Sequence, residues 1–243
     1  INVIELETDM SFGRKNEGND WGLFSEPTPG ISNSNFSYEG SLSMPELSLE
    51  SGFYDSNQLQ IELESDDDGA SIHFTLDGSP PTPSDLEYEY PITINSSTVV
   101  RARSFLDGWV KSNITTKTYL LSEDPPSGLP AIFITTDPNS FFDDDTGMYM
   151  MGPNADTWNF PYFGANFWED WERPIHFEIL EVDGTGYDAD AGVKIFGGWS
   201  RAFPQKSLSI FSRSHIGPSV FEYKFFPNSD INKYESFVLR NSG

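Results

Sequence analysis

The stretch of sequence best suited to chemistry runs from Gly192 to Phe211, GVKIFGGWSRAFPQKSLSIF. Two apolar runs typical of strands, Gly192 to Phe196 and Ser207 to Phe211, flank a short loop. The loop contains Gly197, Gly198, Ser200, Arg201, Pro204 and Lys206. Glycines permit a tight turn that exposes backbone N–H groups, and Arg and Lys supply fixed positive charges. The pattern predicts a site for an anion, with phosphate as the obvious candidate.

The distribution of charge supports this interpretation. The chain of 243 residues has a net charge of −24, which disfavours nucleic acid and anionic membranes as partners. Residues 191–243 nevertheless carry seven basic and three acidic side chains, whereas residues 124–190 carry one and fourteen. Such a cationic tract favours a local anionic ligand. The alternative is that Arg201 and Lys206 form weak surface pairs with the acidic segment.

Composition narrows the class of protein. The absence of cysteine excludes disulfides and thiolate metal sites. No apolar run approaches the roughly 20 residues of a membrane helix, so we expect no membrane insertion. High acidity, many turn residues and few lysines fit an exported, extracellular protein. Because the sequence starts at Ile1 without a signal segment and stops just after a strand-like run, we expect it to be part of a longer protein.

Short strands are predicted in two regions separated by a linker at residues 122–129. In residues 37–122, apolar residues alternate at 59–63 and 72–76, and further strands are expected at 92–94, 98–105 and 115–120. This spacing is typical of an immunoglobulin-like β-sandwich. His73 falls on the polar side of its strand and is expected at the surface.

The second region is predicted to be β-rich with some helix, so the whole chain is mainly β with an α+β second part. Strands are expected at 131–136, 175–181, 191–196 and 207–211, which places the cationic loop at one end of a β-meander. Between the first two of these strands, Asp143, Asp144 and Asp145 form an acidic turn. Its carboxylates suit calcium, although turn formation or helix capping by Asp is the default.

Half of the residues from Trp158 to Trp171 are aromatic. They are Trp158, Phe160, Tyr162, Phe163, Phe167, Trp168 and Trp171. Exposed, they would form a stacking platform for sugars. Buried, they would be core, which Pro161, Gly164 and Pro174 favour because they suggest compact irregular packing. The three histidines are isolated, so no zinc motif or catalytic triad is expected.

Two segments of the first half resemble known accessory domains. The series GASIHFTLDGSPPTPSDLEYEYPITI and TVVRARSFLDGWVKS, within residues 45–121, resembles the C-terminal domain of chitobiases and β-hexosaminidases. The segment SFGRKNEGNDWGLFSEPTPGISN resembles the end of a lamin-tail domain, another sandwich. The resemblances imply the C-terminal end of a lamin-tail-like domain at 1–36 and an accessory sandwich at 37–122, the latter without catalytic residues.

Residues 129–243 resemble the CotH kinases, the spore-coat-type atypical protein kinases. The motifs are LPAIFITTDPNSFFDDDTGMY, NFWEDWERPIHFEILEVDG, DAGVKIFGGWSRAFPQKSLSIFSR and FVLRNSG, in that order. The resemblance implies a kinase-like N-terminal lobe, use of ATP with Mg²⁺ or Mn²⁺, and phosphorylation of Ser on secreted or coat proteins of bacteria. In large bacterial members the two accessory domains precede the kinase domain, as here.

The resemblance also assigns residues. The family's Pro-Lys-Lys-Ser motif matches Pro204 to Ser207, so Lys206 would neutralise nucleotide phosphate, with Arg201, Gly197, Gly198 and Ser200 beside it. Gln205 replaces the first Lys of the pair and removes one charge. The family's catalytic and metal-binding Asp residues are expected beyond Gly243, so this segment should be inactive alone.

Two functions are therefore set against each other. The first is a secreted CotH-type kinase to which this segment contributes nucleotide binding. The alternative is an extracellular protein that binds carbohydrate or matrix, in which the kinase-like part is degenerate.

Overall fold

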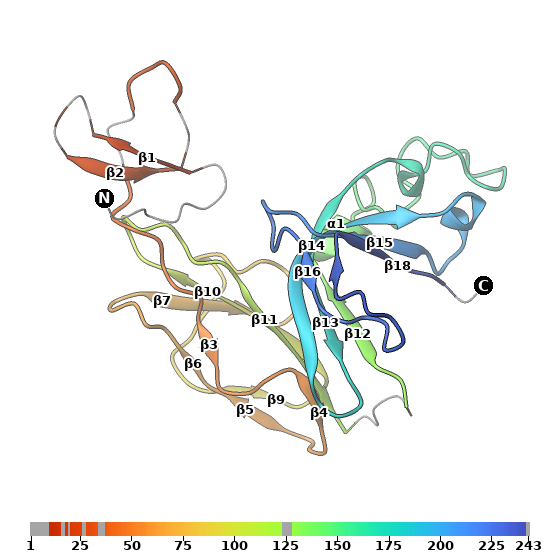
Figure 1. The fold of residues 1–243 in the computed structure, drawn as a ribbon, viewed down its shortest axis with the longest axis horizontal. Coiled ribbons are helices and arrows are strands. Elements are labelled where there is room, and N and C mark those ends of the chain that lie inside the picture. The colour runs from red at the N-terminus through yellow and green to blue at the C-terminus, as the bar shows by residue number, and fades with distance from the viewer. Residues whose placement is uncertain are drawn as a thin grey trace. The chain divides into compact units, whose positions relative to one another are not determined.

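The computed structural model describes residues 10–15, 18, 20–25, 28–33, 37–122 and 128–241. In this part the chain is mainly β, as the sequence predicts (Figure 1). It divides into two compact units, Ile1–Leu76 with Pro80–Glu123 and Asp77–Ser79 with Asp124–Gly243, called here the first and the second unit. Among the described residues, no helix combines the length and apolar character needed to cross a membrane.

The first unit contains a two-layer β-sandwich. One layer is a sheet in the order β4-β11-β10-β7-β8, and the pairs β3-β6 and β5-β9 form the other; a separate hairpin, β1-β2, comes earlier in the sequence. The strands are β1 (Ser11–Arg14), β2 (Trp21–Phe24), β3 (Glu46–Leu47), β4 (Gly52–Tyr54), β5 (Leu59–Ile61), β6 (Leu63–Glu64), β7 (Ser71–Thr75), β8 (Leu86–Glu87), β9 (Ile92–Ile94), β10 (Thr98–Phe105) and β11 (Thr115–Leu121).

The core of this sandwich follows the period of two that the sequence shows. Side chains of both layers meet in it: Ile61, Leu63, Ile72, Phe74, Ile92, Ile94, Val100, Ala102, Tyr119 and Leu121. Successive strand residues point to opposite faces, so every second residue enters the core. The tyrosine is fully buried, and its hydroxyl donates to the Leu49 carbonyl at 2.8 Å.

The prediction that His73 is a surface residue is wrong. Its exposed fraction is 8 %, its Nδ1 lies 3.0 Å from the Asp85 carbonyl oxygen, and its ring meets the edge of Phe105. The face of β7 that points away from the core is therefore also buried. Alternation of apolar and polar residues along a strand does not show whether other residues cover the polar face.

The second unit is built on an antiparallel sheet in the order β12-β13-β14-β15-β18, and β16 and β17 form a separate antiparallel pair. The strands are β12 (Ala131–Thr135), β13 (Arg173–Leu180), β14 (Gly186–Phe196), β15 (Ser207–Phe211), β16 (Phe221–Glu222), β17 (Lys233–Tyr234) and β18 (Ser236–Leu239). One helix, α1 (Pro138–Phe142), and two 3-10 helices, η1 (Asn166–Trp168) and η2 (Trp199–Ala202), lie in its loops. The predicted meander is confirmed.

Apolar side chains of the meander form the core of the second unit. Phe177, Ala191, Val193, Ile210 and Phe221 have exposed fractions of 0 %. Strands β14 and β15 pair from Gly192 opposite Phe211 to Phe196 opposite Ser207. The buried side chains of the core hold the two strands in this register. The loop between them, residues 197–206, is consequently held at the edge where the pairing stops.

A bidentate ion pair connects the residue before β13 with the segment that follows β15. The Arg213 guanidinium donates to the two carboxylate oxygens of Glu172, at 2.6 Å from Nε and 2.9 Å from Nη2. The Glu172 carboxylate lies over Gly192 of β14, where an added Cβ would come within 2.1 Å of it. The arrangement lowers the pKa of Glu172, chiefly through the Arg213 hydrogen bond.

Glu172→Gln should therefore lower the free energy of unfolding by roughly 1 kcal/mol at neutral pH, since the pair is partly exposed. A carboxylate with a lowered pKa in the folded state stabilises the fold above its unfolded pKa, which is 4.5, and this contribution disappears as the pH falls through the lower folded value. Urea unfolding of the unaltered chain and of Glu172→Gln at pH 7 and pH 3 measures how the difference in the free energy of unfolding depends on pH. Glu222→Gln, which breaks the exposed pair with Lys233, is the control and should change little.

Candidate functional site

The loop between β14 and β15 forms a glycine turn followed by a single turn of 3-10 helix. Gly197 has a φ of 118°, and a Cβ there would lie 2.4 Å from the Ser200 hydroxyl. Any L side chain at this position is strained, so the sequence needs glycine here. Gly198 is the N-terminal flanking residue of η2, and the Arg201 N–H donates to its carbonyl at 3.1 Å.

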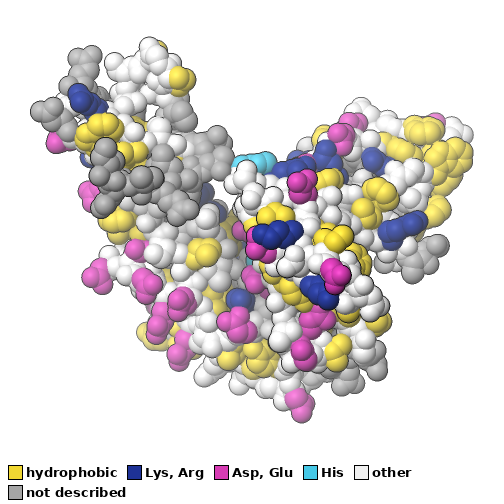
Figure 2. Space-filling model, viewed as in Figure 1, with side chains coloured by type: hydrophobic (Ala, Val, Ile, Leu, Met, Phe, Trp, Pro, Cys, Tyr) yellow, Lys and Arg dark blue, Asp and Glu magenta, His cyan; other side chains and the backbone are white. Residues whose placement is uncertain are grey.

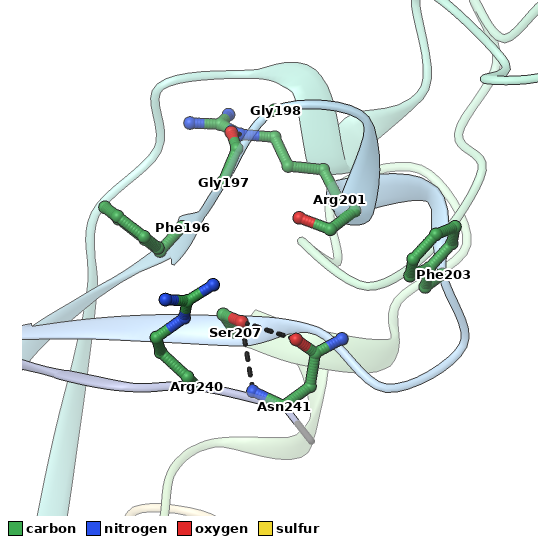
Figure 3. A pocket seen from close by; sticks show the side chains of 9 residues that line it. Phe196, Gly197, Gly198, Arg201, Phe203, Ser207, Arg240 and Asn241 are labelled. Carbon is green, nitrogen blue, oxygen red and sulfur yellow. Dashed lines mark hydrogen bonds between the residues drawn. The ribbon is translucent and has the colours of Figure 1, made fainter. Parts of the chain in front are cut away.

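A pocket of about 550 Å³ lies against this turn (Figure 3). Its lining residues are Phe196, Gly197, Gly198, Ser200, Arg201, Phe203, Ser207, Arg240 and Asn241. Four of the five predicted site residues are thus brought together at one pocket. The lining contains two arginines and no carboxylate, which suits an anion.

The two arginines of the pocket are held differently. Arg201 Nε donates to the Gly197 carbonyl at 2.8 Å, and its Nη1 donates to the Phe167 carbonyl at 3.5 Å, so its guanidinium is anchored along the turn. Arg240 is exposed and has no hydrogen bond or ion pair with any residue that the structure describes. Its donors are therefore available to a ligand.

Lys206 does not line the pocket. Its exposed fraction is 7 %, and its Nζ donates to the carbonyls of Arg201 at 2.6 Å and Phe203 at 3.0 Å. The ammonium also lies 4.1 Å from the ring centroid of Phe167 and 5.5 Å from that of Tyr149, within the range of cation–π attraction. Burial lowers the pKa of Lys206 from 10.5 to about 8.

The surface pairing considered as an alternative is not found in the described part of the chain. There, neither Arg201 nor Lys206 forms a salt bridge with a carboxylate. Lys194 of β14 does form one, with Asp170 at 3.0 Å, so the acidic segment has basic partners other than the loop.

The acidic turn at Asp143 to Asp145 is organised by its first carboxylate. One Asp143 oxygen accepts hydrogen bonds from the N–H groups of Asp145 and Thr146 and from the Thr146 hydroxyl, at 2.8 to 3.1 Å. These bonds lower the pKa of Asp143. Within residues 128–241 and the other described ranges, no group of three or more acidic or histidine side chains is arranged to hold a metal ion.

The aromatic stretch is partly core and partly surface. Phe167 is buried and Trp168 is half-buried, whereas Trp158, Phe160 and Phe163 have exposed fractions of 93, 50 and 57 %. Phe160 joins two exposed rings of the glycine-turn loop, with centroid distances of 5.9 Å to Trp199 and 6.3 Å to Phe203. We call these three rings the aromatic trio; hydrophobic side chains gather over the loops of this region in Figure 2.

Arg240 and Asn241 were not predicted as site residues. They follow β18, whose pairing with β15 brings them to the glycine turn. The signal was present in the FVLRNSG motif, where a polar pair follows an apolar strand, but only the sheet order shows which loop the pair faces.

Comparison with known proteins supports one of the resemblances. Residues 49–116 match the family model of the chitobiase/beta-hexosaminidase C-terminal domain. The matched residues include strands β4 to β10, so the family match falls on the sandwich of the first unit. No curated protein matches the chain. The resemblances of residues 1–36 to lamin-tail domains and of residues 129–243 to CotH kinases stay predictions.

The buried lysine makes stability depend on pH in the alkaline range. Between pH 8 and 10.5 the unfolded chain binds the Lys206 proton more tightly than the folded chain, so the free energy of unfolding should rise with pH across this window. The neutral amine still has two N–H groups for the two carbonyls. Urea unfolding from pH 7 to 10.5 should show this rise for the unaltered chain relative to Lys206→Met; parallel curves would contradict it.

Proposed function

We propose that the second unit binds the phosphate groups of a nucleotide, as the N-terminal part of a secreted CotH-type kinase. The observation that carries this proposal is the pocket at the glycine turn. Arg201 and Arg240 are among its lining residues, and no carboxylate is. Arginine forks match phosphate oxygens geometrically, and in an acidic chain such a pocket favours anions locally.

The apolar part of the pocket also suits a nucleotide. Phe196 and Phe203 are its apolar side chains, with exposed fractions of 44 and 43 %. A planar base can stack on such a ring while its phosphates reach the arginines. This combination favours a nucleotide over an inorganic anion.

The pocket supplies binding and no transfer chemistry. Mg²⁺ or Mn²⁺ bound with ATP needs oxygen ligands, and the nine lining residues include no Asp or Glu. These residues do not fit the metal, so we assign no step to it. Phosphoryl transfer to Ser of a secreted or coat protein belongs, in this proposal, to the complete kinase and not to this unit alone.

Lys206 serves the pocket in this proposal through the loop. Its ammonium donates to the carbonyls of Arg201 and Phe203, two residues that line the pocket. Direct contact between Lys206 and phosphate, which the family resemblance implies, stays a prediction.

Calorimetric titration of the chain with ADP in metal-free buffer tests the proposal. Arg201→Gln should weaken binding at least tenfold, because a charged hydrogen bond contributes on the order of 1.5–3 kcal/mol. Lys224→Gln removes an exposed cation of the same unit outside the pocket and should leave binding unchanged. Absence of ADP binding by the unaltered chain, or equal losses in both variants, would refute the proposal.

A second candidate function is carbohydrate binding at the aromatic trio. Exposed rings of Phe160, Trp199 and Phe203 lie next to one another, and sugars stack on exposed aromatic faces. The family match of the first unit to a domain of chitobiases and β-hexosaminidases adds context but assigns no ligand.

Retention of the chain on insoluble chitin or cellulose tests the second candidate. Trp199→Ala should reduce retention several-fold, since one stacked ring contributes on the order of 1 kcal/mol. Phe226→Ala, at another exposed ring of the second unit, is the matched control and should be retained normally. A chain that passes through both columns would rule out this function for these polysaccharides.

A further inference from the structure

We infer that Asn241 is a positioning residue, which sets Arg240 across the pocket from Arg201 and so makes the pocket selective for a polyphosphate chain over a single phosphate. The inference rests on the proposed function and deepens it. It names the part of the ligand that is recognised and the residue that makes the recognition possible.

The first step concerns the end of β18. The pairing of β15 with β18 ends at Leu208–Leu239, one residue before Arg240. Beyond this point no ladder hydrogen bond holds the chain, and Arg240 has no hydrogen bond or ion pair of its own with the described residues. Its position must therefore be set by its neighbours.

The second step is the anchoring of Asn241. Its backbone N–H donates to the Ser207 hydroxyl at 3.1 Å, and that hydroxyl donates to its Oδ1 at 2.9 Å. Its Nδ2 donates to the Gln205 carbonyl at 2.8 Å. Both polar groups of the Asn241 side chain thus bind the chain at or just before the start of β15, where Ser207 is 3 % exposed. The side chain of Gln205 takes no part, because the contact is to its carbonyl.

The third step is the geometry of the two cations. Figure 3 shows Arg240 pointing from the β18 side toward the glycine turn, along which Arg201 lies. Two guanidiniums that approach from different segments can contact successive phosphates of one chain. A single phosphate satisfies one fork only, so the second arginine adds affinity for diphosphates and triphosphates alone.

Calorimetric titrations with AMP, ADP and tripolyphosphate in metal-free buffer test the inference. In the unaltered chain, ADP and tripolyphosphate should bind at least tenfold more tightly than AMP. Arg240→Gln should remove most of this preference while changing AMP affinity less than about twofold. Asn241→Ala should shift the same preference in the same direction, and Lys224→Gln should leave it unchanged.

A double-mutant cycle separates positioning from general destabilisation. If Asn241 acts through Arg240, Asn241→Ala should have little further effect on ADP binding once Arg240→Gln is present. An undiminished loss in that background, or an equal loss of AMP and ADP affinity in Asn241→Ala, would overturn the inference while leaving the proposed function intact. Absence of ADP and tripolyphosphate binding by the unaltered chain would overturn both. Far-UV circular dichroism of each variant confirms that it is folded.

Discussion

The candidate site depends on a buried ammonium that has no carboxylate partner. A charge removed from water is costly unless polar groups surround it, so Lys206 requires acceptors within the loop. The carbonyls of Arg201 and Phe203 and the ring of Phe167 meet this requirement. Because these acceptors lie at the end of η2 and in the 3-10 helix η1, the ammonium joins two short elements that have few backbone hydrogen bonds of their own. Arg201 is placed at the pocket as a result.

Strand positions in the second unit and in the sandwich could be predicted because they depend on local pattern. The predicted strands at 92–94, 98–105 and 207–211 have the bounds that the structure shows. Apolar residues at every second position lie on one face of a strand, so the alternation itself predicts a strand with that face buried. His73 shows the limit of this reasoning: a covering residue such as Phe105 lies far away in sequence, and no local pattern reports it.

The candidate site was predictable to the extent that it lies in one loop. The glycine turn and Arg201 are close in sequence, so the local sequence is enough to predict that they lie together. Arg240 enters the site through the pairing of β18 with β15, across about thirty residues. Sequence also showed that Lys206 belongs to the loop but not which way its ammonium points. That direction depends on Phe167, which comes from the aromatic stretch interpreted as core.

The acidity of the chain and the cationic pocket act on an anion at different distances. At physiological ionic strength, charges are screened beyond about 8 Å, so most of the 38 acidic side chains contribute little at the pocket. The contacts that Arg201 and Arg240 would make with a bound anion fall within that distance and would persist. At low ionic strength the whole chain repels a polyanion, and added salt first removes this repulsion and only then weakens the contacts. In the proposed complex, selectivity among anions would therefore come from the placement of the two arginines and not from the net charge of the protein.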